Sequence, residues 1–198
     1  MQWVVTPGEI AWEIERSRFV GIVEGLRSPH DAEPLEQVRR RFADATHHCF
    51  AWRYGPLERA EDAGEPRGTA GRPLLELLKA HDVDRAIVIA VRYFGGIRLG
   101  RPGLYRAYAE TGRRALQAAG LASPEALREV TMLLDYGRYQ HWNAVLRTVR
   151  HETLSAEFGA GVRWHGRLSE DDWFRLTARG DWARTVQEDR PVYGVLHA

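Results

Sequence analysis

The longest uninterrupted apolar run of this chain covers residues 86–91 and reads Ala-Ile-Val-Ile-Ala-Val. A short apolar run without alternation is typical of a strand that is covered on both faces. It therefore predicts a sheet in which residues 86–91 form a central strand that is covered on both sides. A membrane-spanning helix needs about 20 apolar residues, so the same run argues against a membrane protein.

A boundary is predicted near residues 120–128, where Gly120 is followed by Pro124. Glycine commonly ends a helix, and a proline close behind it prevents the helix from continuing. The periodicity after this point reads strand, helix, strand, strand, helix, strand, which is the order of a ferredoxin-like βαββαβ unit. We therefore expect an α+β protein with two domains, residues 1–124 and residues 125–198.

Strands are also predicted over residues 10–15, 18–23 and 47–54 of the first domain, and residues 55–68 are predicted to form a polar loop. Adjacent side chains of a strand point to opposite faces. His47 and His48 therefore cannot easily bind one metal ion, and the neighbouring Cys49 faces away from His48. No metal site, cofactor or catalytic residue is predicted for this chain.

The charge balance excludes a strong overall attraction to nucleic acid. The chain has 28 basic and 27 acidic residues and a net charge of +1. Lys79 is the single lysine, so arginine is common everywhere and any one arginine is weak evidence of phosphate binding. The lone Cys49 cannot form an internal disulfide, and the first fifteen residues do not resemble a secretory signal. We expect a cytoplasmic protein.

Two glycine-rich segments, residues 61–73 and 91–108, each lie just before a predicted helix. Such a loop exposes backbone N–H groups and the unpaired first N–H groups of the helix, which can receive an anion. Arginines and the aromatic pair Tyr93 and Phe94 add the charge and stacking surfaces that single-stranded RNA uses. The alternative is a tight connection whose glycines serve only backbone geometry. Neither segment has the P-loop or dinucleotide-binding pattern, which disfavours those enzymes.

Together with His47, His48 and Cys49, these segments resemble the IMPACT/YigZ family. The family pattern is a His-His-Cys strand, an Asp-Asp-Gly-Glu-Pro-x-Gly-Thr-Ala-Gly loop, and Arg-Tyr-Phe-Gly-Gly-x-Lys-Leu-Gly-x-Gly-Gly-Leu-x-Arg-Ala-Tyr. This chain departs from it at three positions, with Ala63 for an acidic residue, Arg98 for lysine and Pro102 for glycine. Pro102 lacks an N–H group, which removes one donor from the predicted anion site.

The resemblance implies an N-terminal domain of the left-handed βαβ type found in a small-subunit ribosomal protein and in a late domain of elongation factor G. It implies a C-terminal domain similar to the last domain of that factor. We expect a non-enzymatic RNA- or ribosome-associated protein that modulates translation. Two alternatives stay open: a protein-interaction adaptor, which the family's eukaryotic members suggest, and a hydrolase that uses Asp62 and Glu65.

The predicted binding cleft lies between the two glycine-rich segments, with the histidines nearby. Its residues are His47, His48, Asp62, Gly64, Glu65, Gly68, Thr69, Gly71, Arg92, Tyr93, Phe94, Gly95, Gly96, Arg98, Gly100 and Arg106. A second RNA surface is predicted in the C-terminal domain, where Arg163, His165 and Arg167 alternate along one strand. A solvated sheet face is the alternative for that row.

Overall fold

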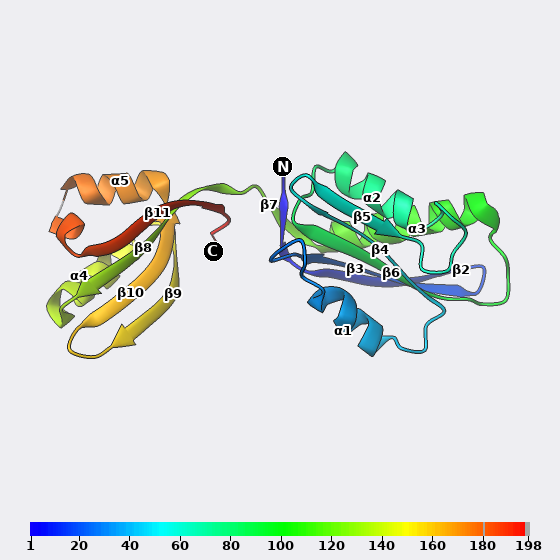
Figure 1. Cartoon of the computed structure of the whole chain (residues 1–198), viewed down its shortest axis with the longest axis horizontal. Helices are drawn as coiled ribbons and strands as arrows, with labels where there is room; N and C mark the ends of the chain where they lie inside the picture. Colours follow the sequence, from blue (N-terminus) through cyan, green and yellow to red (C-terminus); the bar gives the residue numbers. More distant parts are fainter. Residues whose placement is uncertain (180, 197–198) are drawn as a thin grey trace. The chain divides into compact units, whose positions relative to one another are not determined.

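The computed structural model describes residues 1–179 and 181–196 and divides into two compact units, Met1–Ser123 and Pro124–Ala198 (Figure 1). Both units combine antiparallel sheets with helices, so the predicted α+β class is confirmed. Among the described residues, no helix is both long and apolar enough to cross a membrane.

The first unit is built on a five-stranded sheet in the order β2-β3-β6-β4-β5, with every neighbouring pair antiparallel. Both β3 and β4 pair with β6, so they run parallel to each other, and α1 (Glu33–Arg41) connects them. The strands of this sheet are β2 (Gly8–Ile14), β3 (Ser17–Gly25), β4 (His47–Tyr54), β5 (Leu57–Glu61) and β6 (Ala86–Tyr93).

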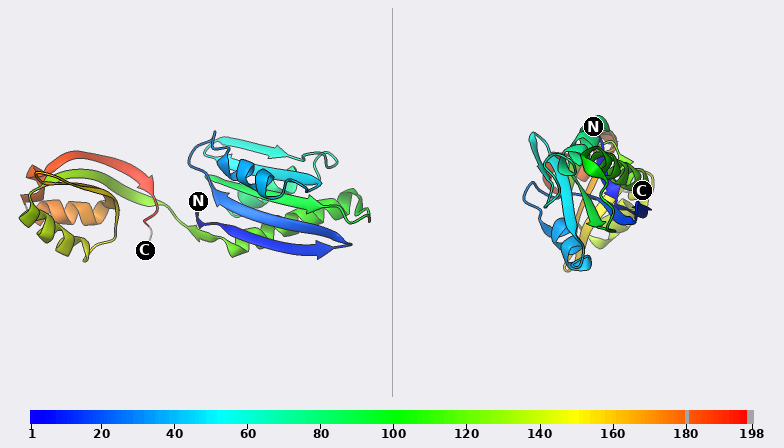
Figure 2. Two further views of the ribbon diagram at one scale, coloured as in Figure 1. Left: turned by 90° about the horizontal axis from the view of Figure 1, so that it is seen from below. Right: turned by 90° about the vertical axis from the view of Figure 1, so that its right-hand side faces the viewer.

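Strand β6 lies at the centre of this sheet, as its apolar run predicts. Every residue from Ala86 to Arg92 is buried. Helices α2 (Gly71–Ala80) and α3 (Gly100–Ala118) cover one face, and α1 covers the other (Figures 1 and 2). Val88 and Ala90 pack in the core beneath α2 and α3, whereas Ile87 and Ile89 pack in the core beneath α1. Even-numbered and odd-numbered residues of β6 therefore lie on opposite faces of the sheet.

The prediction of a polar loop over residues 55–68 is wrong for the first half of this segment. Residues Leu57–Glu61 form β5, an edge strand paired with β4. Four of its five residues are exposed, so it has no hydrophobic alternation by which a sequence would reveal it. A second small sheet, β1 (Trp3–Thr6) with β7 (Gly120–Ala122), also lies outside the predicted elements.

The second unit has the predicted order of elements, and its sheet order β11-β8-β10-β9 is that of a ferredoxin-like domain. Trp142 and Trp164 are fully buried at its centre, with ring centroids 5.2 Å apart in an edge-to-face contact. The elements are β8 (Glu125–Leu134), α4 (Tyr136–Leu146), β9 (His151–Phe158), β10 (Val162–Ser169), α5 (Glu170–Arg179), a 3-10 turn (Asp181–Arg184) and β11 (Val186–Gly194).

Candidate functional site

The loop after β5 is closed by the carboxylate of Asp62. This carboxylate accepts hydrogen bonds from the backbone N–H groups of Gly68 at 2.7 Å, Ala70 at 3.0 Å and Gly71 at 2.9 Å. Burial raises the pKa of Asp62, but the three N–H groups and the charge of Arg101 outweigh it, so the pKa lies below its usual range. The start of α2 thus holds an anion supplied by the chain itself, where the sequence predicts an external one.

Glu65, which follows in the same loop, is buried and forms an ion pair with Arg92. Its Oε1 accepts from Arg92 Nη1 at 2.7 Å and from the Tyr108 hydroxyl at 2.8 Å. The Arg92 side chain is only 5% exposed, and its Nη2 donates to the Ser17 hydroxyl at 3.1 Å. Arg92 therefore ties β6 to the loop and is not a free phosphate ligand, which corrects the prediction for this residue.

Cys49 and Tyr108 complete this buried network. The thiol of Cys49 donates to the carbonyl oxygen of Asp62 at 3.0 Å and lies 3.4 Å from the Tyr108 hydroxyl. Burial raises the pKa of Cys49 to about 12 and also raises the pKa of Tyr108. Because the thiol stays protonated near neutral pH, Cys49 is not an activated nucleophile. Tyr108 is absent from the predicted site, although its hydroxyl contacts both Cys49 and Glu65.

The two histidines point to opposite faces of β4, as predicted. His47 Nδ1 lies 3.0 Å from the carbonyl oxygen of Ala63, and its Nε2 lies 3.8 Å from Glu65. His48 Nε2 lies 2.9 Å from the carbonyl oxygen of Phe42, beneath α1. Across the part of the chain that the structure describes, no three His, Cys, Asp or Glu side chains gather where they could hold a metal ion.

A hollow of about 570 Å³, called here the first hollow, lies between the Asp62 loop and the start of α3. Its floor includes the buried residues Glu65, Arg92 and Leu104. The structure brings seven predicted residues together in its lining: His47, Gly64, Glu65, Arg92, Phe94, Arg98 and Gly100. Five further lining residues are absent from the predicted site: Thr46, Pro66, Leu99, Arg101 and Leu104.

Other predicted residues lie away from this lining. Tyr93 packs with the core beneath α1, and its hydroxyl donates to Asp44 at 2.9 Å, so Tyr93 and Phe94 do not form one stacking surface. A Cβ added to Gly95 would lie 1.9 Å from the carbonyl oxygen of Arg16, so glycine is required where this loop meets the β2–β3 turn. His48, Asp62, Gly68, Thr69, Gly71, Gly95 and Gly96 are also not part of the lining.

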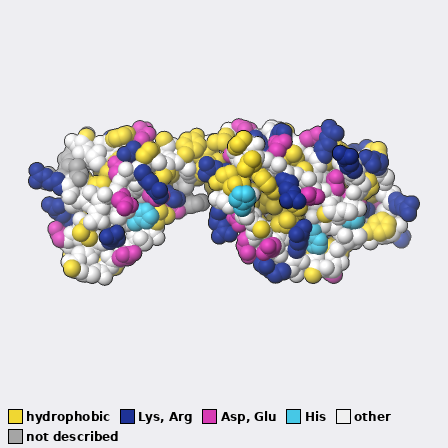
Figure 3. Space-filling view, in the orientation of Figure 1, with side chains coloured by type: hydrophobic (Ala, Val, Ile, Leu, Met, Phe, Trp, Pro, Cys, Tyr) yellow, Lys and Arg dark blue, Asp and Glu magenta, His cyan; other side chains and the backbone are white. Residues whose placement is uncertain are grey.

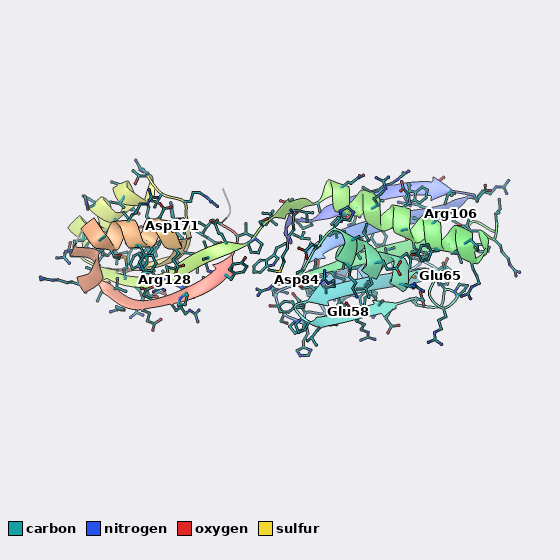
Figure 4. The ribbon with its side chains drawn as sticks, turned by 90° about the horizontal axis from the view of Figure 1, so that it is seen from above. Glu58, Glu65, Asp84, Arg106, Arg128 and Asp171 are labelled. Carbon is teal, nitrogen blue, oxygen red and sulfur yellow. The ribbon has the colours of Figure 1, made fainter. Side chains whose placement is uncertain are left out.

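Arg106 lines a second hollow, of about 600 Å³, which also includes Trp12, Ile14 and Ile97. Figure 4 shows Glu65 and Arg106 on opposite sides of the α3 ribbon near its start. Arg98 and Leu99 line both hollows. The start of α3 therefore separates two depressions of similar size.

The arginines around this helix start differ from most others of the unit in having no acidic partner. In residues 1–123, all of which the structure describes, ion pairs hold Arg27, Arg40, Arg41, Arg59, Arg72, Arg92, Arg113 and Arg114. No carboxylate of the described residues lies within 4.0 Å of Arg67, Arg98, Arg101 or Arg106, and all four are exposed. Figure 3 shows dark-blue Lys and Arg side chains at the right-hand end of this unit, where the loop between β6 and α3 lies.

Helix α3 itself begins without a side-chain cap. It is 19 residues long, and no side chain of residues 1–123 accepts a hydrogen bond from the N–H groups of its first turn. The start of a long helix carries a partial positive charge that favours anions. In contrast to α2, whose first N–H groups are occupied by Asp62, α3 presents this charge beside Arg98 and Arg101.

In the second unit, Arg163, His165 and Arg167 lie on one outward face of β10, as predicted. Carboxylates surround this row. Arg167 donates to Glu129 at 2.8 Å and lies 3.5 Å from Glu152, and His165 Nε2 lies 3.5 Å from Glu129. Because most of the positive charge is matched, the geometry favours a solvated face, and RNA binding there stays a prediction.

The cluster around Glu129 makes the stability of the second unit depend on pH. Burial raises the pKa of Glu129, but hydrogen bonds from Arg190 and Arg167 lower it to about 2. A glutamate in an unfolded chain has a pKa of about 4.3. The stabilisation is therefore complete above about pH 4.3 and is lost as the pH falls toward 2.

We expect the free energy of unfolding of the second unit to fall by about 2 kcal/mol between about pH 4.3 and pH 2. Urea unfolding of the second unit, followed by tryptophan fluorescence between pH 2 and pH 5, measures it. Glu129→Gln is the control and should flatten this part of the pH profile; an unchanged profile in the variant contradicts the assignment.

Comparison with known proteins extends over both units. The family model described as the Impact N-terminal domain matches residues 15–116. An IMPACT family member of Thermus thermophilus is 37% identical over 155 residues, which is 78% of this chain and 86% of that protein. YigZ of Escherichia coli is 32% identical over 168 residues, 81% of this chain and 82% of that protein. A crystal structure of a hypothetical protein, 28% identical, covers 99% of this chain and 97% of that one with a TM-score of 0.62.

Proposed function

Because this chain belongs to the IMPACT family, we propose that it binds RNA or the ribosome through the start of α3 and thereby modulates translation. The link to translation follows from the family resemblance. The binding surface is the exposed part of the two hollows together with Arg67, Arg98, Arg101 and Arg106.

The observation that carries this proposal is the group of unpaired arginines at an uncapped helix start. Arginines are common on this chain, but seven of the ten exposed ones elsewhere in the first unit have a carboxylate partner. Those at the start of α3 have none, although Glu110 lies within the same helix and pairs with Arg113 and Arg114 instead. Exposed arginines without an ion pair at one end of a unit are suited to binding phosphates.

The carboxylates of the alternative hydrolase are already engaged. Asp62 accepts three backbone hydrogen bonds, and Glu65 pairs with Arg92 and Tyr108. Both carboxylates therefore hold the loop in place through these contacts. These contacts support binding over hydrolysis as the role of the site.

Binding to a single-stranded RNA should weaken as salt is raised, and the slope of log K against log salt should change by about 0.7 for each phosphate that the protein no longer neutralises. Arg98→Ala combined with Arg106→Ala should therefore reduce the slope by about 1 to 1.5. Filter binding at several salt concentrations measures this. Arg39→Ala is the matched control, since Arg39 is exposed, has no ion pair and lies on α1, on the other face of the sheet.

Two results would contradict the proposal. One is the absence of RNA binding at low salt. The other is a slope that Arg39→Ala changes as much as the double variant does. A partner that the intact protein retains from a lysate after nuclease treatment would indicate the adaptor role instead.

A further inference from the structure

Two hollows of nearly equal size meet at the start of α3. Their volumes are about 570 and 600 Å³, and both lie in the range of about 300–1,000 Å³ that small-ligand sites occupy. Arg98 and Leu99 line both of them. One ligand that fills both hollows must therefore pass over Arg98.

The junction between the hollows is suited to a negative charge. Arg98 is exposed and has no acidic partner, and α3 begins there at Gly100 without a side-chain cap. Arg92, whose side chain is only 5% exposed, lines the first hollow, and its Nε has no hydrogen-bond partner among the described residues. A phosphate at the junction would meet the helix start and Arg98 together.

Each hollow also has an apolar surface of its own. The ring of Phe94, 45% exposed, lines the first hollow, and the side chain of Ile97, 37% exposed, lines the second beside Trp12. Each hollow has one further unpaired arginine, Arg101 in the first and Arg106 in the second. Flat apolar bases joined by a charged link match this arrangement of two apolar surfaces around a cationic centre.

We propose that the two hollows bind two successive nucleotides of a single strand, with one base in each hollow and the linking phosphate at Arg98 and the start of α3. This inference rests on the proposed function and names its minimal ligand. A duplex does not fit, because its bases are paired and stacked and cannot separate to opposite sides of a helix start. A single nucleotide fills only one hollow.

Calorimetric titration of the full chain with uridine 5′-monophosphate, the dinucleotide UpU, and uridine tetramers and octamers tests this. The expected result is a step of about tenfold or more in affinity from mononucleotide to dinucleotide, the effect of one added base contact, and a much smaller gain per nucleotide beyond it. A gradual rise with length and no step overturns the two-nucleotide site. Failure of every RNA to bind overturns the proposed function itself.

Single-site variants test the two hollows separately. Phe94→Ala removes an aromatic stacking surface from the first hollow and should lower the affinity for UpU by about fivefold or more. Ile97→Ala removes apolar contact area from the second hollow and should lower this affinity by about threefold or more. The double variant should bind UpU no better than the mononucleotide, and Arg39→Ala should change the affinity less than twofold. If only Arg98→Ala weakens binding, the protein contacts the phosphate alone and the proposal is wrong.

Two further ligands show whether the site distinguishes RNA from DNA and a single strand from a duplex. The deoxy dinucleotide has the same bases and linking phosphate without the 2′-hydroxyl. Binding of UpU alone assigns the site to RNA, and equal binding of both assigns it to any single strand; both results support a two-nucleotide site. A duplex RNA of eight base pairs that binds more tightly than the single-stranded octamer overturns it.

Discussion

Arg92→Ala is expected to destabilise the first unit by about 3–5 kcal/mol, the range measured when one partner of a buried ion pair is removed. The Glu65 side chain is 4% exposed and depends on Arg92 for its compensating charge. Without Arg92, this carboxylate stays charged in a buried site or takes up a proton, and both outcomes cost stability. The Ser17 hydroxyl is also left without Arg92 Nη2 as its donor.

Hydrogen exchange of peptides from β6 measures this effect, because it reports on the first unit without interference from the second. Arg98→Ala is the matched control: the two arginines are six positions apart, but Arg98 is exposed and unpaired, so its removal should change stability by no more than about 0.5 kcal/mol. The prediction fails if Arg92→Ala keeps the exchange rates of the original protein and loses only RNA affinity.

The roles of these arginines were in part accessible from the sequence. The run over residues 86–91 indicates a strand buried on both faces, and β6 continues through Arg92. An arginine that extends such a strand needs a buried partner. The same pattern therefore indicates that Arg92 has a structural role that Arg98, which lies beyond the strand, does not share. Strand alternation, which separates His47 from His48, also separates Arg92 from Tyr93. What the sequence does not contain is the identity of the partner, Glu65, 27 residues earlier in the chain.

The fold was easier to predict than the site, because core positions repeat at regular spacings. The second unit follows from such spacing: Val162, Trp164 and Leu168 of β10 alternate with outward residues and are fully buried. Strand β5 was missed because an exposed edge strand has no apolar face. The two hollows depend on where loops meet the start of α3, and loop contacts between distant residues leave no periodic signal.

Asp62→Ala is expected to destabilise the loop that it closes and the start of α2 by about 2–4 kcal/mol. The carboxylate accepts three backbone hydrogen bonds, and bonds to a charged acceptor contribute about 1.5–3 kcal/mol each without being additive. Its removal leaves the N–H groups of Gly68, Ala70 and Gly71 without that acceptor. Hydrogen exchange of these three amides measures the effect directly. Glu61→Ala, one residue earlier at an exposed ion pair with Arg59, is the control and should change their protection little.

The pH dependence of the same amides provides an independent test, because the folded pKa of Asp62 lies below its ordinary value. Stabilisation by a carboxylate with a lowered pKa is complete above the unfolded value of about 3.9 and is lost as the pH falls through the folded pKa. Protection corrected for intrinsic exchange should therefore decrease below about pH 4 in the original protein and not in Asp62→Asn. Since Gly64 and Glu65 of this loop line the first hollow, Asp62→Asn should also weaken RNA binding at neutral pH. Normal RNA affinity in a variant whose loop amides have lost protection would show that the Asp62 loop does not shape the binding surface.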